Sequence, residues 1–221
     1  MAKALDLQEQ EQLEEFKAFW KTYGNWISWL VTLVLLAYAG YNAWGWYQRD
    51  QAGKAAVMFE ELDKAATVGD ADKAGRVFAD LKERFPRTVM AEQGALLAAR
   101  VQLDKGQADA SRASLSWAAE NAGQDEYRDL ANLRLAAALL DAKQPDEALK
   151  RIDAIKLPSF AGLAADRRGD ILLSKGKRDE AKAAYQAAYK AMDDKQEYRR
   201  LVEAKLIALA APPASATEAA K

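Results

Sequence analysis

Uncharged side chains fill one long stretch near the N-terminus of the chain. No charged residue occurs between Lys21 and Arg49. This stretch is long enough to cross the hydrocarbon core of a bilayer, which takes about 20 apolar residues in a helix. Aromatic residues gather at both ends of it, as they do where rings lie at the depth of lipid headgroups. These aromatic residues are Trp20, Tyr23, Trp26 and Trp29 at one end, and Tyr41, Trp44, Trp46 and Tyr47 at the other. The pattern predicts a transmembrane helix over residues 24–48.

Two other interpretations of the apolar stretch remain open. A buried core helix is one, although core helices seldom run this far without a charge. A cleaved signal peptide is the other, because Ala37-Tyr38-Ala39 resembles a small-x-small cleavage site. A signal peptide starts with a short basic region, whereas the residues ahead of this stretch carry more acid than base. We therefore expect the helix to remain as an anchor.

Residues 1–23 predict an amphipathic segment on the cytoplasmic side of the anchor. Leu13, Phe16, Trp20 and Tyr23 recur at helical spacing with acids on the opposite face. Such a helix can lie partly along a membrane surface. The basic residues on the two sides of the span are nearly balanced, so the positive-inside rule does not orient it.

Asn42 is the one strongly polar side chain within the predicted span. It is a candidate for contact with a partner helix in the membrane, since amide side chains hydrogen-bond across helices there. The simpler alternative places Asn42 near the headgroups beside Trp44, where polarity costs little.

The chain after the span repeats itself as four helix–turn–helix units. Each unit has a turn position, a small residue five positions later, and a large apolar residue four positions after that. The turn positions are Gly69, Gly106, Lys143 and Gly176, so the units are separated by steps of 37, 37 and 33 residues. The small residues are Ala74, Ser111, Ala148 and Ala181, and the large residues are Phe78, Leu115, Ile152 and Tyr185. A glycine can close a helix in a left-handed conformation, a small residue lets two helices cross closely, and a large residue fills the groove between units.

The last unit resembles the tetratricopeptide pattern, with Gly169, Gly176, Ala181, Tyr185 and Ala188 at matching places. Lys143 and Ser111 depart from that pattern. The predicted fold class is all-α: one N-terminal transmembrane helix, then a tetratricopeptide-like α-solenoid of about four units over residues 49–211. A helix from about 196 to 210 is expected to cap the solenoid, and residues 212–221 are expected to be a disordered tail.

The missing residue types limit the chemistry. Among 221 residues there is no cysteine and no histidine. Thiolate and imidazole catalysis are therefore excluded, together with metal sites built on those ligands. The formal net charge of −1 gives no basic field for nucleic acid. We expect no enzyme activity, no cofactor, no metal and no small-molecule substrate.

Function is therefore expected to lie in a surface that binds other proteins. Stacked helical hairpins form a concave face from the first helix of each unit, and an apolar groove with charges suits a peptide segment. The candidate residues of this face are Phe59, Asp63, Gln93, Leu96, Arg100, Leu103, Leu130, Leu133 and Ala137. The alternative for each of these leucines is a place in the core. The polar Asp63 and Arg100 are the better candidates for exposure.

Three segments resemble the ancillary SecYEG translocon subunit family. They are residues 14–26 (EEFKAFWKTYGNW), residues 45–48 (GWYQ) and residues 55–62 (AAVMFEEL). The resemblance implies a bacterial inner-membrane protein with a cytoplasmic N-terminus and a periplasmic repeat domain. It implies binding to the SecYEG translocon, to the membrane-anchored periplasmic chaperone PpiD and to exported client polypeptides, which it helps to reach periplasmic chaperones. A general envelope-assembly scaffold with a membrane-anchored repeat domain is the alternative.

Overall fold

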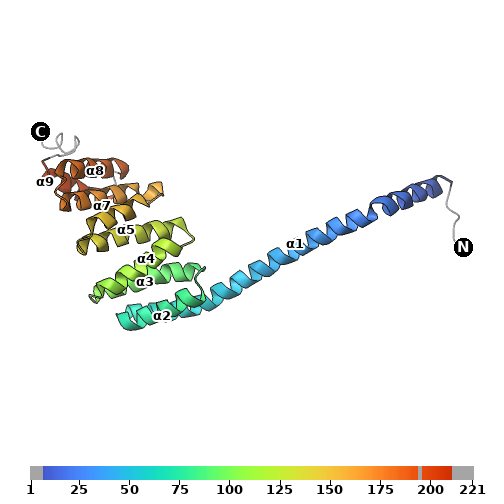
Figure 1. Ribbon diagram of the computed structural model, residues 1–221, viewed down its shortest axis with the longest axis horizontal. Coiled ribbons are helices and arrows are strands. Elements are labelled where there is room, and N and C mark those ends of the chain that lie inside the picture. The colour runs from blue at the N-terminus through green and yellow to red at the C-terminus, as the bar shows by residue number, and fades with distance from the viewer. Residues whose placement is uncertain (1–6, 194–195, 211–221) are drawn as a thin grey trace. The chain divides into compact units, whose positions relative to one another are not determined.

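The computed structural model of this chain describes residues 7–193 and 196–210. The predicted tail, residues 212–221, lies outside the described residues, as do residues 1–6 of the predicted N-terminal segment. Every regular element in the described ranges is helical (Figure 1). The chain divides into two compact units, Met1–Gln51 and Ala52–Lys221.

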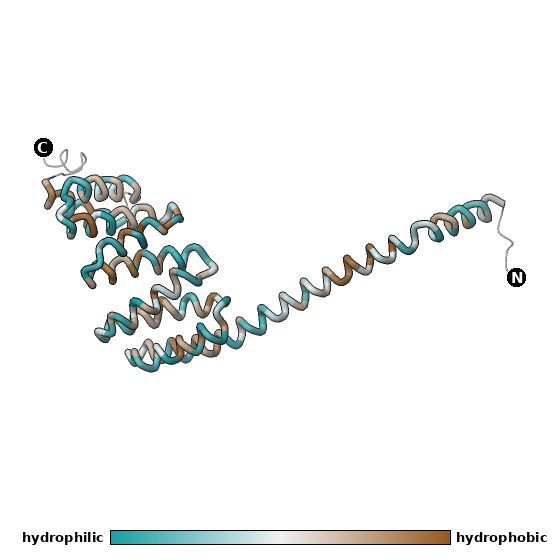
Figure 2. The backbone as a smooth tube through the Cα atoms, viewed as in Figure 1, coloured by the Kyte–Doolittle hydropathy of each residue, from teal (hydrophilic) through white to brown (hydrophobic). Residues whose placement is uncertain are grey.

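The first unit consists of the greater part of helix α1, which spans Leu7–Thr67. The helix passes without a break through both predicted boundaries, residues 23 and 48. Among the described residues, α1 is the one helix long and apolar enough to cross a membrane. Its middle forms the apolar band of Figure 2, and side chains such as Trp26 (77% exposed) and Leu36 (69% exposed) are uncovered. A core helix would bury these side chains, so the exposure favours a lipid-facing helix.

The second unit is a stack of helical hairpins. Residues 52–67 of α1 pack on α2 (Ala71–Arg84) through a shared apolar cluster, and α3 (Val89–Asp104) pairs with α4 (Ala108–Asn121). Next, α5 (Asp125–Asp141) pairs with α6 (Pro145–Asp153), and α7 (Ala161–Ser174) pairs with α8 (Arg178–Ala191). A short 3₁₀ turn, η1 (Pro158–Phe160), precedes α7, and α9 (Glu197–Ala208) packs on α8. The predicted four units and capping helix are confirmed.

The four turns between paired helices share one backbone geometry. Gly69, Gly106, Lys143 and Gly176 all have positive φ, between 62° and 77°. In each turn the following N–H donates to the carbonyl five residues earlier, as from Gln144 to Leu139 at 2.9 Å. This is the Schellman ending of a helix, which requires a left-handed residue. In the third unit this left-handed position is therefore occupied by a lysine, whereas the other three turns have glycine there.

Replacing Lys143 by glycine should raise the stability of the third hairpin. A residue with a Cβ costs about 1 kcal/mol in the left-handed region, and glycine avoids that cost. Hydrogen exchange of the α5 and α6 amides should show slower opening in Lys143→Gly. The matched control is Gly106→Ala, which should have the opposite effect on α3 and α4. Faster opening of α5 in Lys143→Gly would contradict this account of the turn.

The predicted ladder of small and large residues lies between the paired helices. Ala74, Ser111, Ala148 and Ala181 are all buried, as are Phe78, Leu115, Ile152 and Tyr185. In the last unit, a Cβ added to Gly169 would stand only 2.8 Å from Cζ of Tyr185, so the ring fills the space that this glycine leaves. The largest residue of the ladder thus packs on the smallest possible partner.

Buried acids fasten the linkers between consecutive hairpins. Glu92 in the first turn of α3 accepts the N–H groups of Gly123 at 2.9 Å and Gln124 at 3.4 Å. Asp129 on α5 accepts those of Lys156 at 3.0 Å and Leu157 at 2.8 Å. Both carboxylates are almost fully buried, so these bonds satisfy them and hold each hairpin's exit against its own first helix.

A network of charges and hydroxyl groups attaches the capping helix. Asp166 on α7 is 1% exposed and accepts hydrogen bonds from Tyr198 at 2.8 Å and from Lys205 at 2.8 Å. The ammonium of Lys205 also donates to Asp170 at 2.7 Å, and Tyr185 donates to the same carboxylate at 2.8 Å. Val202 and Leu206 of α9 are buried beside this network.

The network makes the cap sensitive to alkaline pH. Burial and the hydrogen bond to Asp166 raise the pKa of Tyr198 from 10.0 to about 12, and burial together with Asp170 raises the pKa of Tyr185. Since the unfolded chain loses these protons first, the network's contribution is complete below pH 10 and declines as pH rises towards 12. Thermal unfolding followed by circular dichroism should show this decline. The decline should be smaller in Tyr198→Phe, and equal slopes for both chains would exclude Tyr198 as its source.

Candidate functional site

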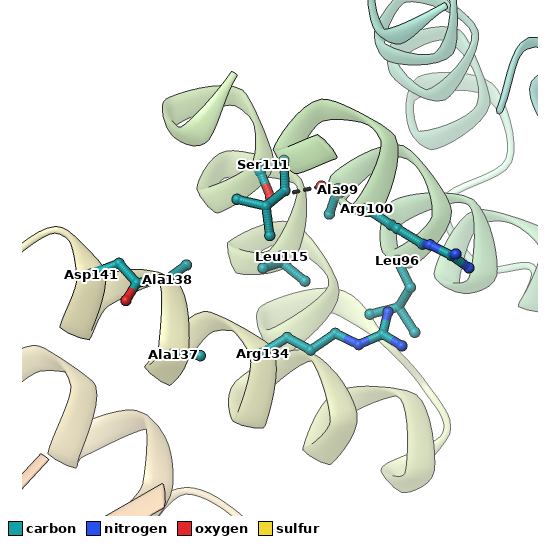
Figure 3. A pocket seen from close by; sticks show the side chains of 10 residues that line it. Leu96, Ala99, Arg100, Ser111, Leu115, Arg134, Ala137, Ala138 and Asp141 are labelled. Atoms are coloured by element: carbon teal, nitrogen blue, oxygen red, sulfur yellow. Dashed lines mark hydrogen bonds between the residues drawn. The ribbon is translucent and has the colours of Figure 1, made fainter. Parts of the chain in front are cut away.

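A pocket of about 300 Å³ opens between α3 and α5 (Figure 3). Its lining residues come from α3, α4 and α5. They are Leu96, Ala99, Arg100, Leu103, Ser111, Leu115, Arg134, Ala137, Ala138 and Asp141. The pocket lies within the second unit, between the first helices of two neighbouring hairpins.

Helical spacing places these side chains together. Residues 96, 99, 100 and 103 form one face of α3, and residues 134, 137, 138 and 141 form one face of α5. Ser111 and Leu115 of α4 close the space between them. The hydroxyl of Ser111 donates to the carbonyl of Ala99 at 2.7 Å, so it is already satisfied. The interior of the pocket is therefore mainly apolar.

Two arginines stand at one end of the pocket and one acid at the other. Figure 3 shows the guanidinium groups of Arg100 and Arg134 on the same side, with Asp141 across the pocket. Partial burial, followed by repulsion from Arg100, lowers the pKa of Arg134. Arg100 forms a long ion pair with Asp104, at 3.9 Å, and both side chains are largely exposed. Asp104 therefore neutralises the charge of Arg100 only weakly.

Four of the nine residues predicted for the concave face line this pocket: Leu96, Arg100, Leu103 and Ala137. Leu103 is 51% exposed, whereas Leu96 is 7% exposed. Leu96 therefore belongs to the core as well as to the pocket wall, and it also packs within the largest apolar cluster. A binding role for these four residues stays a prediction.

The other five predicted residues lie elsewhere in the second unit. Phe59 and Leu130 are half-buried against the main core cluster, and Leu133 is half-buried against a smaller one. The amide of Gln93 donates to the hydroxyl of Tyr127 at 2.5 Å, and Asp63 is exposed. Their part in binding also stays a prediction.

Arg134 and Asp141 are pocket residues that the sequence analysis did not identify. Arg134 lies one helical turn before Ala137, and Asp141 lies one turn after it. That spacing places both residues on the same helix face as Ala137, so the sequence contained a signal by which they could have been predicted. Arg100 belongs to another hairpin, so its proximity to Arg134 could be found only from the way the two hairpins stack.

Asn42 lies in the first unit and is exposed on α1. Its amide donates to the carbonyl of Tyr38 one helical turn earlier, at 2.9 Å. This bond satisfies part of the polar group within its own helix. Contact of Asn42 with a partner helix stays a prediction.

Comparisons with known proteins cover nearly the whole chain. The family model of the tetratricopeptide repeat-like domain matches residues 17–211. The chain is 31% identical over 210 residues to the "Ancillary SecYEG translocon subunit" of Neisseria gonorrhoeae, covering 93% of this chain and 99% of that one. It is 30% identical over 185 residues to the protein of the same description from Escherichia coli, covering 82% of this chain and 87% of that one.

A solved structure supports the fold alone. The crystal structure of MamA protein superposes with a TM-score of 0.52 and 22% sequence identity, over 62% of this chain and 72% of that chain.

Proposed function

This chain belongs to the family of ancillary SecYEG translocon subunits, and we propose that it is a non-enzymatic accessory subunit of that translocon. The single observation that carries the proposal is the extent of the match. It covers 99% of the length of the Neisseria gonorrhoeae protein, so the apolar helix and the repeat domain are shared together. A repeat domain by itself would show only the fold.

The proposed arrangement places residues 24–48 of α1 in the inner membrane, the N-terminus in the cytoplasm and the repeat domain in the periplasm. The exposed apolar and aromatic side chains of α1 support the membrane placement. The periplasmic side rests on the family resemblance. In this arrangement the repeat domain binds proteins at the exit of the translocon. It passes exported client polypeptides to the periplasmic chaperone network, with PpiD as its membrane-anchored partner.

Purification of the full chain from native membranes in mild detergent tests the proposed partners. Mass spectrometry of the purified complex is expected to recover the SecYEG subunits and PpiD well above their levels in a purification from untagged membranes. Recovery of a different envelope complex, without translocon subunits, would replace the proposal with a general envelope-assembly scaffold.

A reporter fused after Lys221 tests the topology. An alkaline phosphatase fusion at this position is expected to be active, because that enzyme needs the oxidising periplasm to form its disulfides. A fluorescent-protein fusion that matures only in the cytoplasm serves as the control and is expected to be dark. The opposite pair of results would place the repeat domain in the cytoplasm.

A further inference from the structure

We propose that the pocket between α3 and α5 binds a short polypeptide segment that carries an apolar side chain close to a carboxylate. The apolar side chain enters the pocket, and the carboxylate lies against Arg100 and Arg134. This inference rests on the proposed function, because it gives the chemistry of a segment that the repeat domain would recognise.

The size and lining of the pocket suit a side chain rather than a whole small ligand. Its volume of about 300 Å³ is at the lower limit for ligand pockets, which extend to roughly 1,000 Å³. Leu96, Leu115 and Ala137 supply alkyl surface, and the hydroxyl of Ser111 is occupied by Ala99. An apolar side chain would therefore be transferred from water to alkyl surface without leaving a polar group unpaired.

The two arginine side chains at the open end of the pocket favour the binding of an anion. Arg134 makes no hydrogen bond or ion pair with any residue that the structure describes, and its guanidinium is repelled by Arg100. Two like charges side by side are unfavourable, and a shared carboxylate between them removes the repulsion. A guanidinium binds a carboxylate through two parallel hydrogen bonds. A carboxylate is therefore the ligand that would complete the interactions of Arg100 and Arg134.

The opposite end of the pocket favours a polypeptide as the source of that acid. Asp141 lies across the pocket from the two arginines. A purely anionic ligand such as a lipid headgroup with a long apolar chain gains nothing from this carboxylate. A polypeptide segment offers backbone N–H groups or a basic side chain to Asp141 while its acid meets the arginines.

Selection from a random peptide library against the full chain in detergent micelles tests the proposal. The selected peptides are expected to share an apolar residue within four positions of Asp or Glu. Converting that acid to its amide should weaken binding at least tenfold in a fluorescence anisotropy titration. A library that yields no shared pattern, a basic pattern, or peptides that bind equally well as amides would overturn the proposal.

Two variants and one matched control connect the binding to this pocket. Arg100→Gln with Arg134→Gln should weaken the selected peptides at least tenfold, and Ala137→Phe should do the same by filling the pocket. The control is Arg76→Gln with Arg87→Gln, which removes the same net charge from two exposed residues outside the pocket and should leave binding within twofold. Circular dichroism establishes that each variant is folded. Equal loss in the control, or full binding by folded Arg100→Gln with Arg134→Gln, would refute the assignment.

These outcomes are separate from those of the proposed function. If native purification recovers the translocon but the selected peptides do not bind at the pocket, only the present inference fails. If the pocket selects acidic apolar peptides but no translocon subunit is recovered, the site stands and the translocon assignment fails.

Discussion

Replacing Gly169 by alanine is expected to destabilise the fourth hairpin by about 3 kcal/mol, at the upper end of the cost of overpacking a core. The added Cβ would overlap the ring of Tyr185, with Cζ only 2.8 Å away. Tyr185 cannot move aside easily, because the ring is 1% exposed and its hydroxyl is bonded to Asp170 at 2.8 Å. The helices α7 and α8 would have to separate.

Hydrogen exchange of the α7 and α8 amides, read by mass spectrometry, measures this loss. Stacked repeats are coupled mainly to their neighbours, so protection in α2 and α3 should change little. Gly53→Ala is the matched control, since a Cβ at that helical glycine meets nothing within 4 Å apart from its chain neighbours and the backbone of its own helix. That change should stabilise α1 locally by about 0.5–1 kcal/mol. Protection of α8 that matches the unchanged chain would show that the Gly169–Tyr185 packing is wrong.

The hairpin framework could be predicted from the sequence because it depends on local patterns. Turn positions, small residues and large residues recur at fixed offsets, and each is decided by contacts between two helices adjacent in the chain. Lys143 was assigned to a turn against its residue type, by spacing alone, and its positive φ confirms the assignment.

The pocket was only partly predictable, and the reason is physical. The first helix of each repeat packs on its own partner helix and on the next repeat, so helical periodicity cannot tell which apolar face stays open. Leu103 is 51% exposed, whereas Leu96, two turns earlier on α3, is buried. The proximity of Arg100 and Arg134 depends on how two hairpins stack, over a separation that no local pattern encodes.

The structural roles of the buried acids could not be predicted from the sequence for a related reason. Glu92, Asp129 and Asp166 recur every 37 residues, which was a usable signal. Their partners are backbone N–H groups or side chains about 30 to 40 residues away, so no short motif contains both halves of the interaction. Asp166 also lies one helical turn nearer to its turn residue than the other two, because the last step is 33 residues.

Replacing Lys205 by methionine is expected to cost about 3–4 kcal/mol in the attachment of α9, because removing one partner of a buried ion pair leaves the other charge uncompensated. Methionine keeps the length of the side chain, so the loss reports the charge and its hydrogen bonds. The ammonium now bonds Asp166 at 2.8 Å and Asp170 at 2.7 Å. Asp166 is 1% exposed, so water cannot take the place of the ammonium without opening the interface between α7 and α9.

Hydrogen exchange of the α9 amides should show this loss first, because α9 would then lose its ion pairs to α7 and keep only its apolar contacts and the hydrogen bonds of Tyr198 and Arg199. Arg200→Ala is the control on the same helix, since Arg200 is exposed, and it should change protection by less than about 0.5 kcal/mol. Adding Asp166→Asn to Lys205→Met should recover part of the stability, because the uncompensated charge is then removed. A double variant weaker than Lys205→Met alone would mean that Asp166 stabilises the cap through Tyr198 more than through its charge pair with Lys205.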